Sequence, residues 1–478
     1  MAVILQLVCG ALTTLDLNAA AGAGFRASAW NQAIATPTYG GDPPPVAETM
    51  DLILESTNHD DMASDMQHLH AYAVQADAYR RDRTVQDPVW LQCKMANETG
   101  TRQALVLRID GDFRLPLYTL GCEAGVSKTR VRVQITRGPY WEATTAAATA
   151  AASPAATAVV THDYTAGLTD PPGDVPARLA PLWINSANVT SIPRLWMGFR
   201  SYDRHGSLND FEPLWEIEDA GIVTAGGADL SAAQADATAS GGNRRDVSFA
   251  TQAGWYKRFD VSLTAYSTNE EANYGTFLWL LRACNSDAST SCDVQLRFGG
   301  AQYADAQMVQ GPIVTIPAAQ TDWEWYELGV KPYPLVRDLH AFPLALLDED
   351  TDRLDTVRFM ARRTAGAANL KLDCLVRIPV DEGFASVKQA AMTADAGVYI
   401  AETPEMYPSA ESYHSTTGYT WWRPELRANG FRPPVGDGRL IVAYGRASST
   451  VITDAITFAA GGWIPRWLSL RGADAWAT

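Results

Sequence analysis

The chain has 478 residues, of which 47% are hydrophobic and 19% are charged, and its net charge is −16. This length is too great for one ordinary hydrophobic core, so we expect two to four domains. The hydrophobic content is that of a globular protein and argues against a disordered chain. An acidic chain without runs of Lys and Arg also argues against a nucleic-acid-binding protein, because phosphate contacts need clustered basic residues.

The first seven residues are apolar and raise the question of a signal peptide. No Lys or Arg precedes Arg26, so the positively charged segment that begins a signal peptide is missing. Val3, Leu5 and Leu7 occupy alternate positions, which predicts a first β-strand instead. No apolar run is long enough for a transmembrane helix, and we therefore expect no membrane insertion.

The stretch from Glu48 to Ile109 predicts one helix between strands. Apolar residues recur there at the spacing of one helix face: Met62, Met66, Leu69, Ala73 and Ala76. Thr57 and Asn58 are capping residues, and acidic residues at the start with arginines at the end complement the helix dipole. We predict a helix over residues 60–82. Alternating apolar residues predict strands over 48–54, 89–95, 104–109 and 130–136.

These patterns predict a mainly β protein. Residues 1–142 are expected to form an N-terminal β-barrel or sandwich with one flanking α-helix. Residues 143–175 are rich in Ala and Thr and are interpreted as an exposed arm or linker. Strands at the spacing of a sandwich predict an inserted jelly-roll β-sandwich at 225–380. Residues 176–224 and 381–478 are expected to form one discontinuous β-sandwich around it.

The six cysteines form no CxxC motif or Cys/His cluster, which argues against a zinc site. Cys284 and Cys292 flank a turn-rich loop, so a hairpin would place them opposite each other. A disulfide between them remains open beside the interpretation favoured for a protein made in the cytosol, two reduced thiols.

No sequence motif for a nucleophile, a cofactor or a phosphate loop is present. The densest acidic run, Asp348 to Asp355, is not an EF-hand, because Arg353 and Phe359 replace the required Gly and Glu. A less regular calcium loop and a solvated acidic loop both remain open there. The seven histidines are interpreted as structural or solvated: His59, His68, His70, His162, His205, His340 and His414.

Pairs of acidic residues for glycoside hydrolysis are available at Glu216 and Glu218 and at Glu324 and Glu327, as expected by chance in an acidic chain. Most of the fifteen tryptophans are interpreted as core residues, although the adjacent pair Trp421-Trp422 must face both sides of a sheet. We therefore predict no catalytic, cofactor-binding or metal-binding residues, and a protein that is not an enzyme.

The first unit resembles the N-terminal domain of siphophage distal tail and tail-tube-like proteins. The resemblance rests on residues 46–54, the helix within 60–83, and the segments 88–91, 137–142 and 465–472. It implies a β-barrel or sandwich with one helix, and self-association into a ring of six subunits. The implied partners are the tail tube and the tail tip hub. The implied location is the virion, after synthesis in the host cytoplasm.

The inserted sandwich resembles the jelly-roll carbohydrate-binding domains carried by tail-tip proteins, which implies a decoration role or contact with a host surface glycan. The leading hypothesis is a distal tail or baseplate ring protein of a bacteriophage. Two alternatives remain: a carbohydrate-binding surface or adhesin protein, and a glycan hydrolase whose carboxylates the sequence does not reveal.

Overall fold

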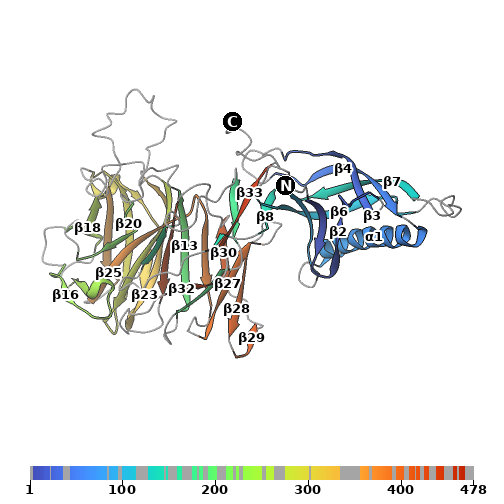
Figure 1. The fold of residues 1–478 in the computed structure, drawn as a ribbon. Helices are drawn as coiled ribbons and strands as arrows, with labels where there is room; N and C mark the ends of the chain where they lie inside the picture. Colours follow the sequence, from blue (N-terminus) through green and yellow to red (C-terminus); the bar gives the residue numbers. More distant parts are fainter. Residues whose placement is uncertain are drawn as a thin grey trace, which may run out of the picture.

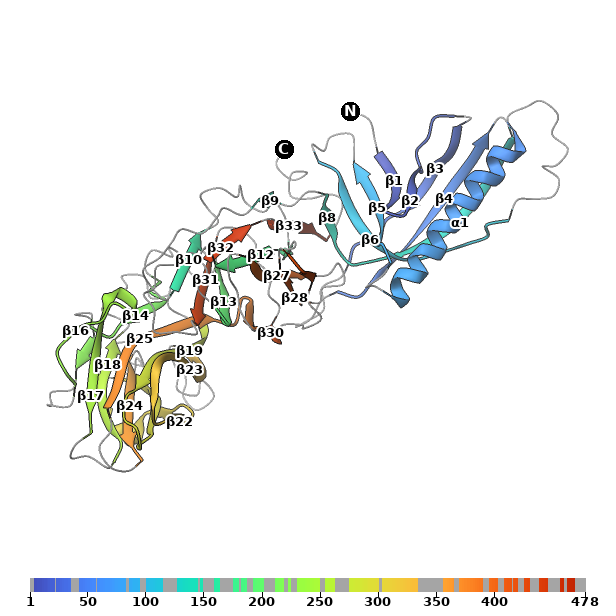
Figure 2. The same cartoon turned by 90° about the horizontal axis from the view of Figure 1, so that it is seen from below.

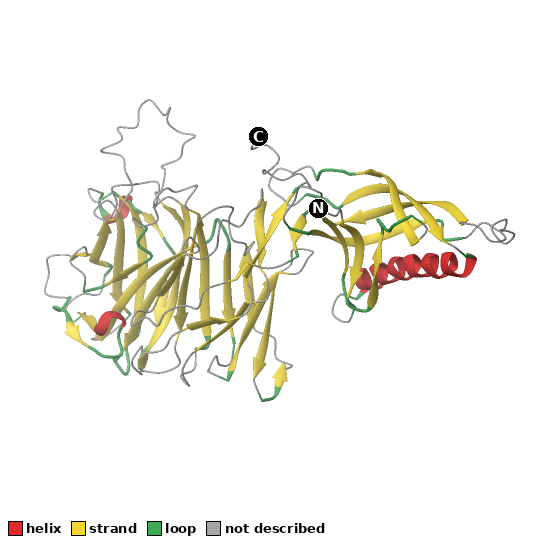
Figure 3. Cartoon of the chain, viewed as in Figure 1, coloured by secondary structure: helices red, strands yellow, loops and turns green. Residues whose placement is uncertain are grey.

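The protein is described here from a computed structural model. It describes residues 4–21, 23–35, 43–56, 58–82, 86–94, 100–114, 127–144, 147–148, 159–163, 175–179, 182–186, 192–201, 211–218, 222–224, 230–249, 254–262, 275–300, 303–333, 356–364, 369–389, 395–402, 408–414, 416–419, 425–429, 438–445, 456–459 and 462–468. The predicted mainly β fold class is confirmed, since several antiparallel sheets accompany one α-helix in these residues (Figure 3). None of their helices is long and apolar enough to span a bilayer.

The N-terminal unit lies at one end of an elongated molecule, and the β-sandwiches lie at the other (Figures 1 and 2). Its sheet has eleven strands among the described residues: β1 (Ile4–Cys9), β2 (Leu12–Asp16), β3 (Ala23–Asn31), β4 (Val46–Ser56), β5 (Val89–Lys94), β6 (Arg102–Gly111), β7 (Ser127–Arg137), β8 (Trp141–Ala143), β9 (Ala147–Ala148), β11 (Val175–Leu179) and β33 (Gly462–Trp467). The sheet curves back on itself beside Leu17. This residue donates to the Leu5 carbonyl at 2.8 Å and accepts from the Ala27 N–H at 2.8 Å.

One helix, α1 (His59–Arg81), lies across the concave side of this sheet, close to the predicted bounds of 60–82. The Asn58 side chain caps it by accepting from the Asp61 N–H at 2.8 Å. Its buried residues follow a 3.6-residue period: Met62, Met66, Leu69, Tyr72, Ala76 and Tyr79. All of these except Tyr79 join Val131 and Val133 of β7 in one core, so the helix covers the apolar side of the sheet.

A buried cluster of three charged residues joins the end of the chain to this unit. Glu142 on β8 accepts from Arg178 of β11 at 2.8–3.1 Å and from Arg466 of β33 at 2.9 Å. All three are buried, with Glu142 3% exposed and Arg466 1% exposed. Burial alone would raise the pKa of Glu142, but the two guanidinium groups outweigh it and hold this pKa below its usual value.

The remaining strands form four sheets in two sandwiches. The first sandwich has two sheets: β10 (Val159–Asp163), β31 (Gly438–Gly445), β13 (Arg194–Ser201), β26 (Phe384–Lys388) and β30 (Glu425–Asn429) in one, and β29 (Gly418–Tyr419), β28 (Pro408–His414), β27 (Ala396–Glu402), β12 (Leu182–Ser186) and β32 (Ile456–Ala459) in the other. Strands from both sides of the predicted insertion therefore pair directly, as β13 does with β26 and β31.

The second sandwich also has two sheets: β14 (Leu214–Glu216), β16 (Gln234–Ala235), β17 (Asn243–Ser248), β25 (Asn369–Pro379), β19 (Gly275–Asn285) and β23 (Gln320–Tyr333) in one, and β15 (Ile222–Thr224), β18 (Tyr256–Ser262), β24 (Thr356–Arg363), β20 (Cys292–Gly299), β21 (Val309–Gln310) and β22 (Val314–Ile316) in the other. Short 3-10 turns occupy Ser240–Gly242 and Asp305–Gln307. The two sandwiches share one hydrophobic core.

Sheet membership corrects several predicted boundaries. β14 and β15 were placed in the discontinuous sandwich, but they pair with β25 and β18 of the inserted one. β33 and β11 pair with each other in the N-terminal sheet, where Glu142 compensates their arginines. The predicted arm at 143–175 also contains strands in its described part. β10 begins with β-branched residues and pairs with β31, and β9 pairs with β33.

The hairpin that would place Cys284 and Cys292 opposite each other does not form, and the favoured interpretation, two reduced thiols, is confirmed. Cys284 lies on β19 in one sheet of the inserted sandwich, and Cys292 lies on β20 in the other sheet, because the loop between them crosses from sheet to sheet. Both are free, buried thiols. Burial raises the pKa of each thiol to about 12, so both stay protonated at neutral pH.

We predict that Glu142→Gln will lower the free energy of unfolding by about 3–5 kcal/mol, because it removes the buried carboxylate that the Arg178 and Arg466 guanidinium groups both bind. Denaturant unfolding measures this loss. Asp51→Asn is the matched control, since Asp51 pairs with the exposed Arg132 and its loss should cost far less. Equal losses in the two variants would contradict the importance of the buried cluster.

A second prediction concerns the contact between the two sandwiches. A Cβ on Gly198 of β13 would lie 2.3 Å from the Pro379 carbonyl oxygen and 2.8 Å from Ile378 Cγ2. Gly198→Ala should therefore destabilise the protein by about 1–3 kcal/mol or more through overpacking. Gly100→Ala is the control, because a Cβ there meets nothing within 4 Å. A thermal unfolding midpoint that is unchanged in Gly198→Ala would show that this junction can relax.

Candidate functional site

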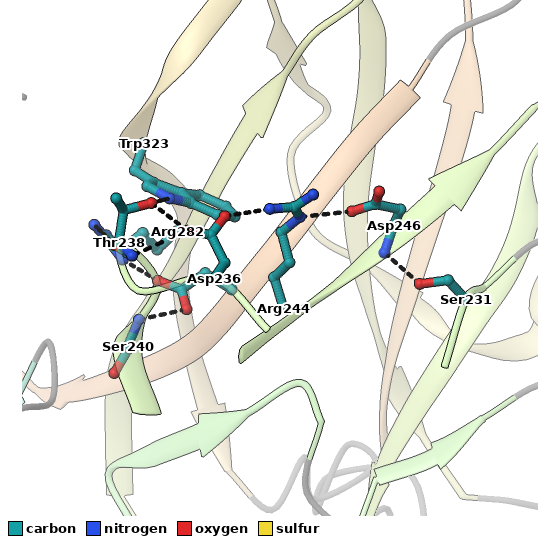
Figure 4. Close-up of polar contacts among 9 residues, drawn as sticks. Ser231, Asp236, Thr238, Ser240, Arg244, Asp246, Arg282 and Trp323 are labelled. Carbon is teal, nitrogen blue, oxygen red and sulfur yellow. Dashed lines mark hydrogen bonds and ion pairs between the residues drawn. The ribbon is translucent and has the colours of Figure 1, made fainter. Parts of the chain in front are cut away.

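A polar cluster in the inserted sandwich includes Asp373 on β25. Figure 4 shows its other members, among them Ser240, Arg282 and Trp323. The Asp373 carboxylate is fully buried and forms an ion pair with Arg282 of β19, and it accepts from the Ser240 N–H at 2.8 Å. Arg282 also donates to the Thr238 carbonyl at 3.1 Å and lies over the ring of Trp323. This network fixes the segment around Ser240 against the sheet.

The network extends along that segment toward solvent. The Trp323 indole N–H donates to the Thr238 hydroxyl at 2.9 Å, and this hydroxyl donates to Asp236 at 2.6 Å. Arg244 joins Asp236 to Asp246. Each of these polar side chains has an oppositely charged or hydrogen-bonded partner, as Figure 4 shows. A cluster whose polar groups are partnered in this way is typical of a structural network.

The same cluster contains the set of described residues with metal-ligand geometry. Ligand atoms of Glu216, Asp373 and Cys374 lie within 4.8 Å of one another. Gly241, at φ +66°, lets the backbone lie against Glu216, since a Cβ there would be 3.4 Å from the Glu216 carboxyl carbon. Glu216 itself accepts a hydrogen bond from the Ser240 hydroxyl.

The donor set does not suit a metal ion. Asp373 already binds the Arg282 guanidinium, and a divalent cation would have to displace or repel that charge. Burial raises the pKa of the Cys374 thiol well above its usual value, so thiolate formation is disfavoured. We therefore interpret Glu216, Asp373 and Cys374 as part of the sandwich's polar core.

The acidic pairs considered for glycoside hydrolysis do not converge on one cleft. Glu216 lies beside Ser240, as described above. Glu327 forms an ion pair with Arg194 and accepts from the Trp196 indole N–H at 3.0 Å, so it joins the two sandwiches. Burial, followed by the charge of Asp322, raises the pKa of Glu324.

The described histidines are also dispersed. On α1, the His68 ring lies 5.4 Å from Tyr72 and the His70 ring lies 5.3 Å from Phe113. His414 Nδ1 accepts from the Thr416 N–H at 3.1 Å. The acidic run at 348–355, His205, His340 and Trp421-Trp422 lie outside the described residues.

A cleft of about 840 Å³ separates α1 from the end of β6. Its wall combines the apolar side chains of Met66 and Phe113 with Gln67, His70 and an exposed ion pair between Asp112 and Arg114. From the sequence we predict that the polar side of α1, with Asp65, Gln67, His68 and Arg81, is free to contact a neighbouring subunit. Of these, Gln67 and Arg81 are exposed, and Asp65 and His68 are partly buried. The sequence pattern gave no sign of the cleft, because its wall depends on how β6 ends.

No family model and no curated protein matches the chain. Two solved structures are weakly similar to it. The Dit (gp 19.1) protein of SPP1, described as a paradigm of the hub adsorption apparatus in phages that infect Gram-positive bacteria, is 8% identical, with a TM-score of 0.18 over 78% of this chain and 99% of that chain. The tandem CBM22-1–CBM22-2 domain of Paenibacillus barcinonensis Xyn10C is 8% identical, with a TM-score of 0.20 over 59% and 99%. Both scores are too low to support an argument about function.

We predict that Asp373 makes stability depend on pH between about 4 and 7. Burial raises the pKa of this carboxyl to about 7, above its usual value of 3.8, although Arg282 acts in the opposite direction. The folded state therefore keeps a proton that the unfolded state loses, and this contribution to stability disappears as the pH rises through 7.

Asp373→Asn should flatten the dependence of the unfolding free energy on pH in this range, as urea titrations at a series of pH values would measure. In the control Asp51→Asn, the slope should persist, because Arg132 lowers the pKa of Asp51 and moves its titration below about pH 4. A slope in Asp373→Asn that parallels the unmodified protein would refute the assignment.

Proposed function

We propose that this chain is a non-enzymatic structural component of a bacteriophage tail. In this role it is a distal tail or baseplate ring protein in the virion, made in the host cytoplasm. It joins the tail tube to the tip hub and holds its β-sandwiches outward. The observation that carries the proposal is the N-terminal unit, in which α1 lies across a curved sheet at one end of an elongated chain (Figure 2). This is the arrangement that the sequence resemblance implies.

The N-terminal unit has the two-sided shape that ring contacts require. One side of the sheet is covered by α1, and the other side exposes every second residue of β7, including Lys128, Arg130 and Arg132. A ring of identical subunits needs two different, complementary surfaces on each copy, because its contacts are heterologous. The number of subunits that we propose is six, as the resemblance implies.

The sandwiches are well suited to project from such a ring as one rigid piece. Trp325 of β23 donates from its indole N–H to the Tyr444 carbonyl at 2.9 Å, across the junction between the two sandwiches. Its ring also contacts Trp196 of β13, with ring centroids 5.8 Å apart. A junction built on buried aromatic residues resists domain motion.

The second candidate function is a carbohydrate-binding surface protein. The observation that favours it is a pair of adjacent aromatic residues at the start of β18: Trp255 is partly exposed and Tyr256 is 42% exposed. Exposed aromatic rings pack against the apolar faces of sugars. However, the Arg362 guanidinium already lies 4.6 Å from the Trp255 ring centroid and competes for that ring. Binding of the purified protein to a glycan array would favour this candidate.

We predict that the purified protein forms rings with a central hole, visible in negative-stain electron micrographs. Light scattering after size-exclusion chromatography should give a mass that is a fixed multiple of the 51.8 kDa chain. The tail tube protein and the tip hub protein of the same phage should bind the assembled form. A chain that stays monomeric at high concentration and binds neither protein would overturn the proposed function.

A further inference from the structure

One sheet of the second sandwich carries charged side chains on the side that faces away from the core. Strands β18, β24 and β20 lie next to one another in this sheet, and alternate residues of each strand enter the shared hydrophobic core. On the other side, Arg297 lies directly opposite Arg358, and Asp293 lies directly opposite Arg362. Asp260 lies opposite Arg358 on its second neighbouring strand. We call these five residues the outer charged face.

Two of the three arginines on this face bind carboxylates. Arg358 donates to the two carboxylate oxygens of Asp260 at 2.8 and 3.1 Å, and to the Asp305 carboxylate at 2.8 Å. Arg362 donates to the Asp293 carboxylate at 2.9 Å. The charges of these two arginines are therefore balanced within the protein.

The third arginine, Arg297, has only neutral partners. Its Nε donates to the Gln295 side-chain oxygen at 3.1 Å, and its Nη1 donates to the main-chain carbonyl oxygen of Asp305 at 3.0 Å. No ion pair between described residues includes Arg297, and its Nη2 donates to none of them. Yet Arg297 is only 7% exposed, and buried arginines are normally paired with an anion. The like charge of Arg358 directly opposite adds to the cost of this position.

The groups around Arg297 suit a sugar that carries such an anion. Trp255 is partly exposed, and its ring centroid lies 5.9 Å from the Arg297 guanidinium. Arg362 lies 4.6 Å from the same centroid, so a ligand contacts the part of the ring that Arg362 leaves uncovered. Gln310 of β21 is exposed and lies directly opposite Arg297. An aromatic ring packs against the C–H groups of a sugar, and an amide hydrogen-bonds to its hydroxyl groups.

We propose that the outer charged face binds an acidic saccharide at Arg297. A carboxylate or phosphate on the sugar accepts hydrogen bonds from the Arg297 guanidinium, and the sugar ring contacts Trp255 and Gln310. A guanidinium binds carboxylates and phosphates through the same planar set of donors, so either group is a source of the anion. A neutral sugar would leave the charge of Arg297 without a partner. The inference goes beyond the proposed function, because a chain that does not assemble would show the same binding.

Glucose, glucuronic acid and glucose 6-phosphate test the inference, because these sugars share one ring and differ only at C6. Ligand-observed NMR titrations with the purified full-length chain measure their binding. We expect glucuronic acid, glucose 6-phosphate or both to bind, whereas glucose at the same concentration does not. The acid that binds more tightly identifies the anion as a carboxylate or a phosphate. Inorganic phosphate is the control for an anion without a sugar ring, and it should bind more weakly than the acidic sugar.

Variants locate the binding. In Arg297→Gln we expect the dissociation constant of the acidic sugar to rise about tenfold or more, because charge-assisted hydrogen bonds are lost. Arg297→Lys keeps the charge and should retain part of the binding. Gln310→Ala, at an exposed residue, should also raise this constant. Arg132→Gln is the matched control, since it makes the same change of charge at an exposed residue of the N-terminal sheet and should leave binding unchanged. Thermal unfolding checks that each variant is folded.

Several results would overturn the inference. If neither acidic sugar binds, or if glucose binds as tightly as they do, Arg297 does not recognise an anionic sugar. If inorganic phosphate binds as tightly as glucose 6-phosphate, the sugar ring contributes nothing. If folded Arg297→Gln and Gln310→Ala bind like the unmodified chain, the site lies elsewhere. The proposed function fails separately: rings that bind no acidic sugar would leave it standing, and a monomeric chain that binds one would support this inference alone.

Discussion

The buried contact of Glu142 with Arg178 and Arg466 is the constraint on which the rest of the chain depends. A carboxylate and two guanidinium groups can leave water only together, because each unpaired charge would cost several kcal/mol. Glu142 and Arg466 are 324 residues apart in sequence, and they meet because β33 pairs with β8 at the edge of the N-terminal sheet. The sheet of the N-terminal unit therefore includes β33 only after the chain has returned to it, a non-local contact of the kind that slows folding.

The position of β33 in the N-terminal sheet also determines where the strands between β11 and β33 lie. Because β11 and β33 are held in the N-terminal sheet, the strands that follow β11 and precede β33 must begin and end near it. They form the first sandwich there, with β12 and β32 as direct neighbours. The second sandwich leaves this one between β13 and β26 and packs against it through Trp325 and Glu327. The order of the units along the molecule thus follows from two sets of buried contacts.

The sequence predicted those elements whose signals are local. The helix was predicted within about one residue of its ends, because Asn58 and the paired charges mark both termini independently. The strand at 130–136 was predicted from alternation alone and is the centre of β7. Which distant strands and charged residues pair with each other was less predictable. Nothing near Arg466 shows that its counter-charge is Glu142, and the short strand at Leu214 has the same apolar pattern in either sandwich.

The candidate sites also divide into features that one segment determines, which the sequence predicted, and features that need distant segments, which it did not. Periodicity identified α1 and its polar side, because a helix face is a property of one segment. It missed the polar network around Asp373, whose members come from three separate segments at 236–244, 282 and 373. It also left open a hairpin that would place Cys284 and Cys292 opposite each other, whereas the loop between them crosses from one sheet to the other. Only pairing between distant strands could have revealed that crossing.

Charge in the N-terminal unit serves two separate purposes that burial distinguishes. The ion pair of Glu48 with Arg137 is buried with side-chain exposures of 1% and 0%, and losing one partner would leave a charge without compensation. The pairs on the outer side of the sheet are exposed to water and salt, so they contribute little to folding. Strand β7 would keep its core side with Thr or Val in place of its exposed basic residues. The exposed basic residues of β7 are therefore not needed to form the sheet, whereas the buried pair of Glu48 and Arg137 is.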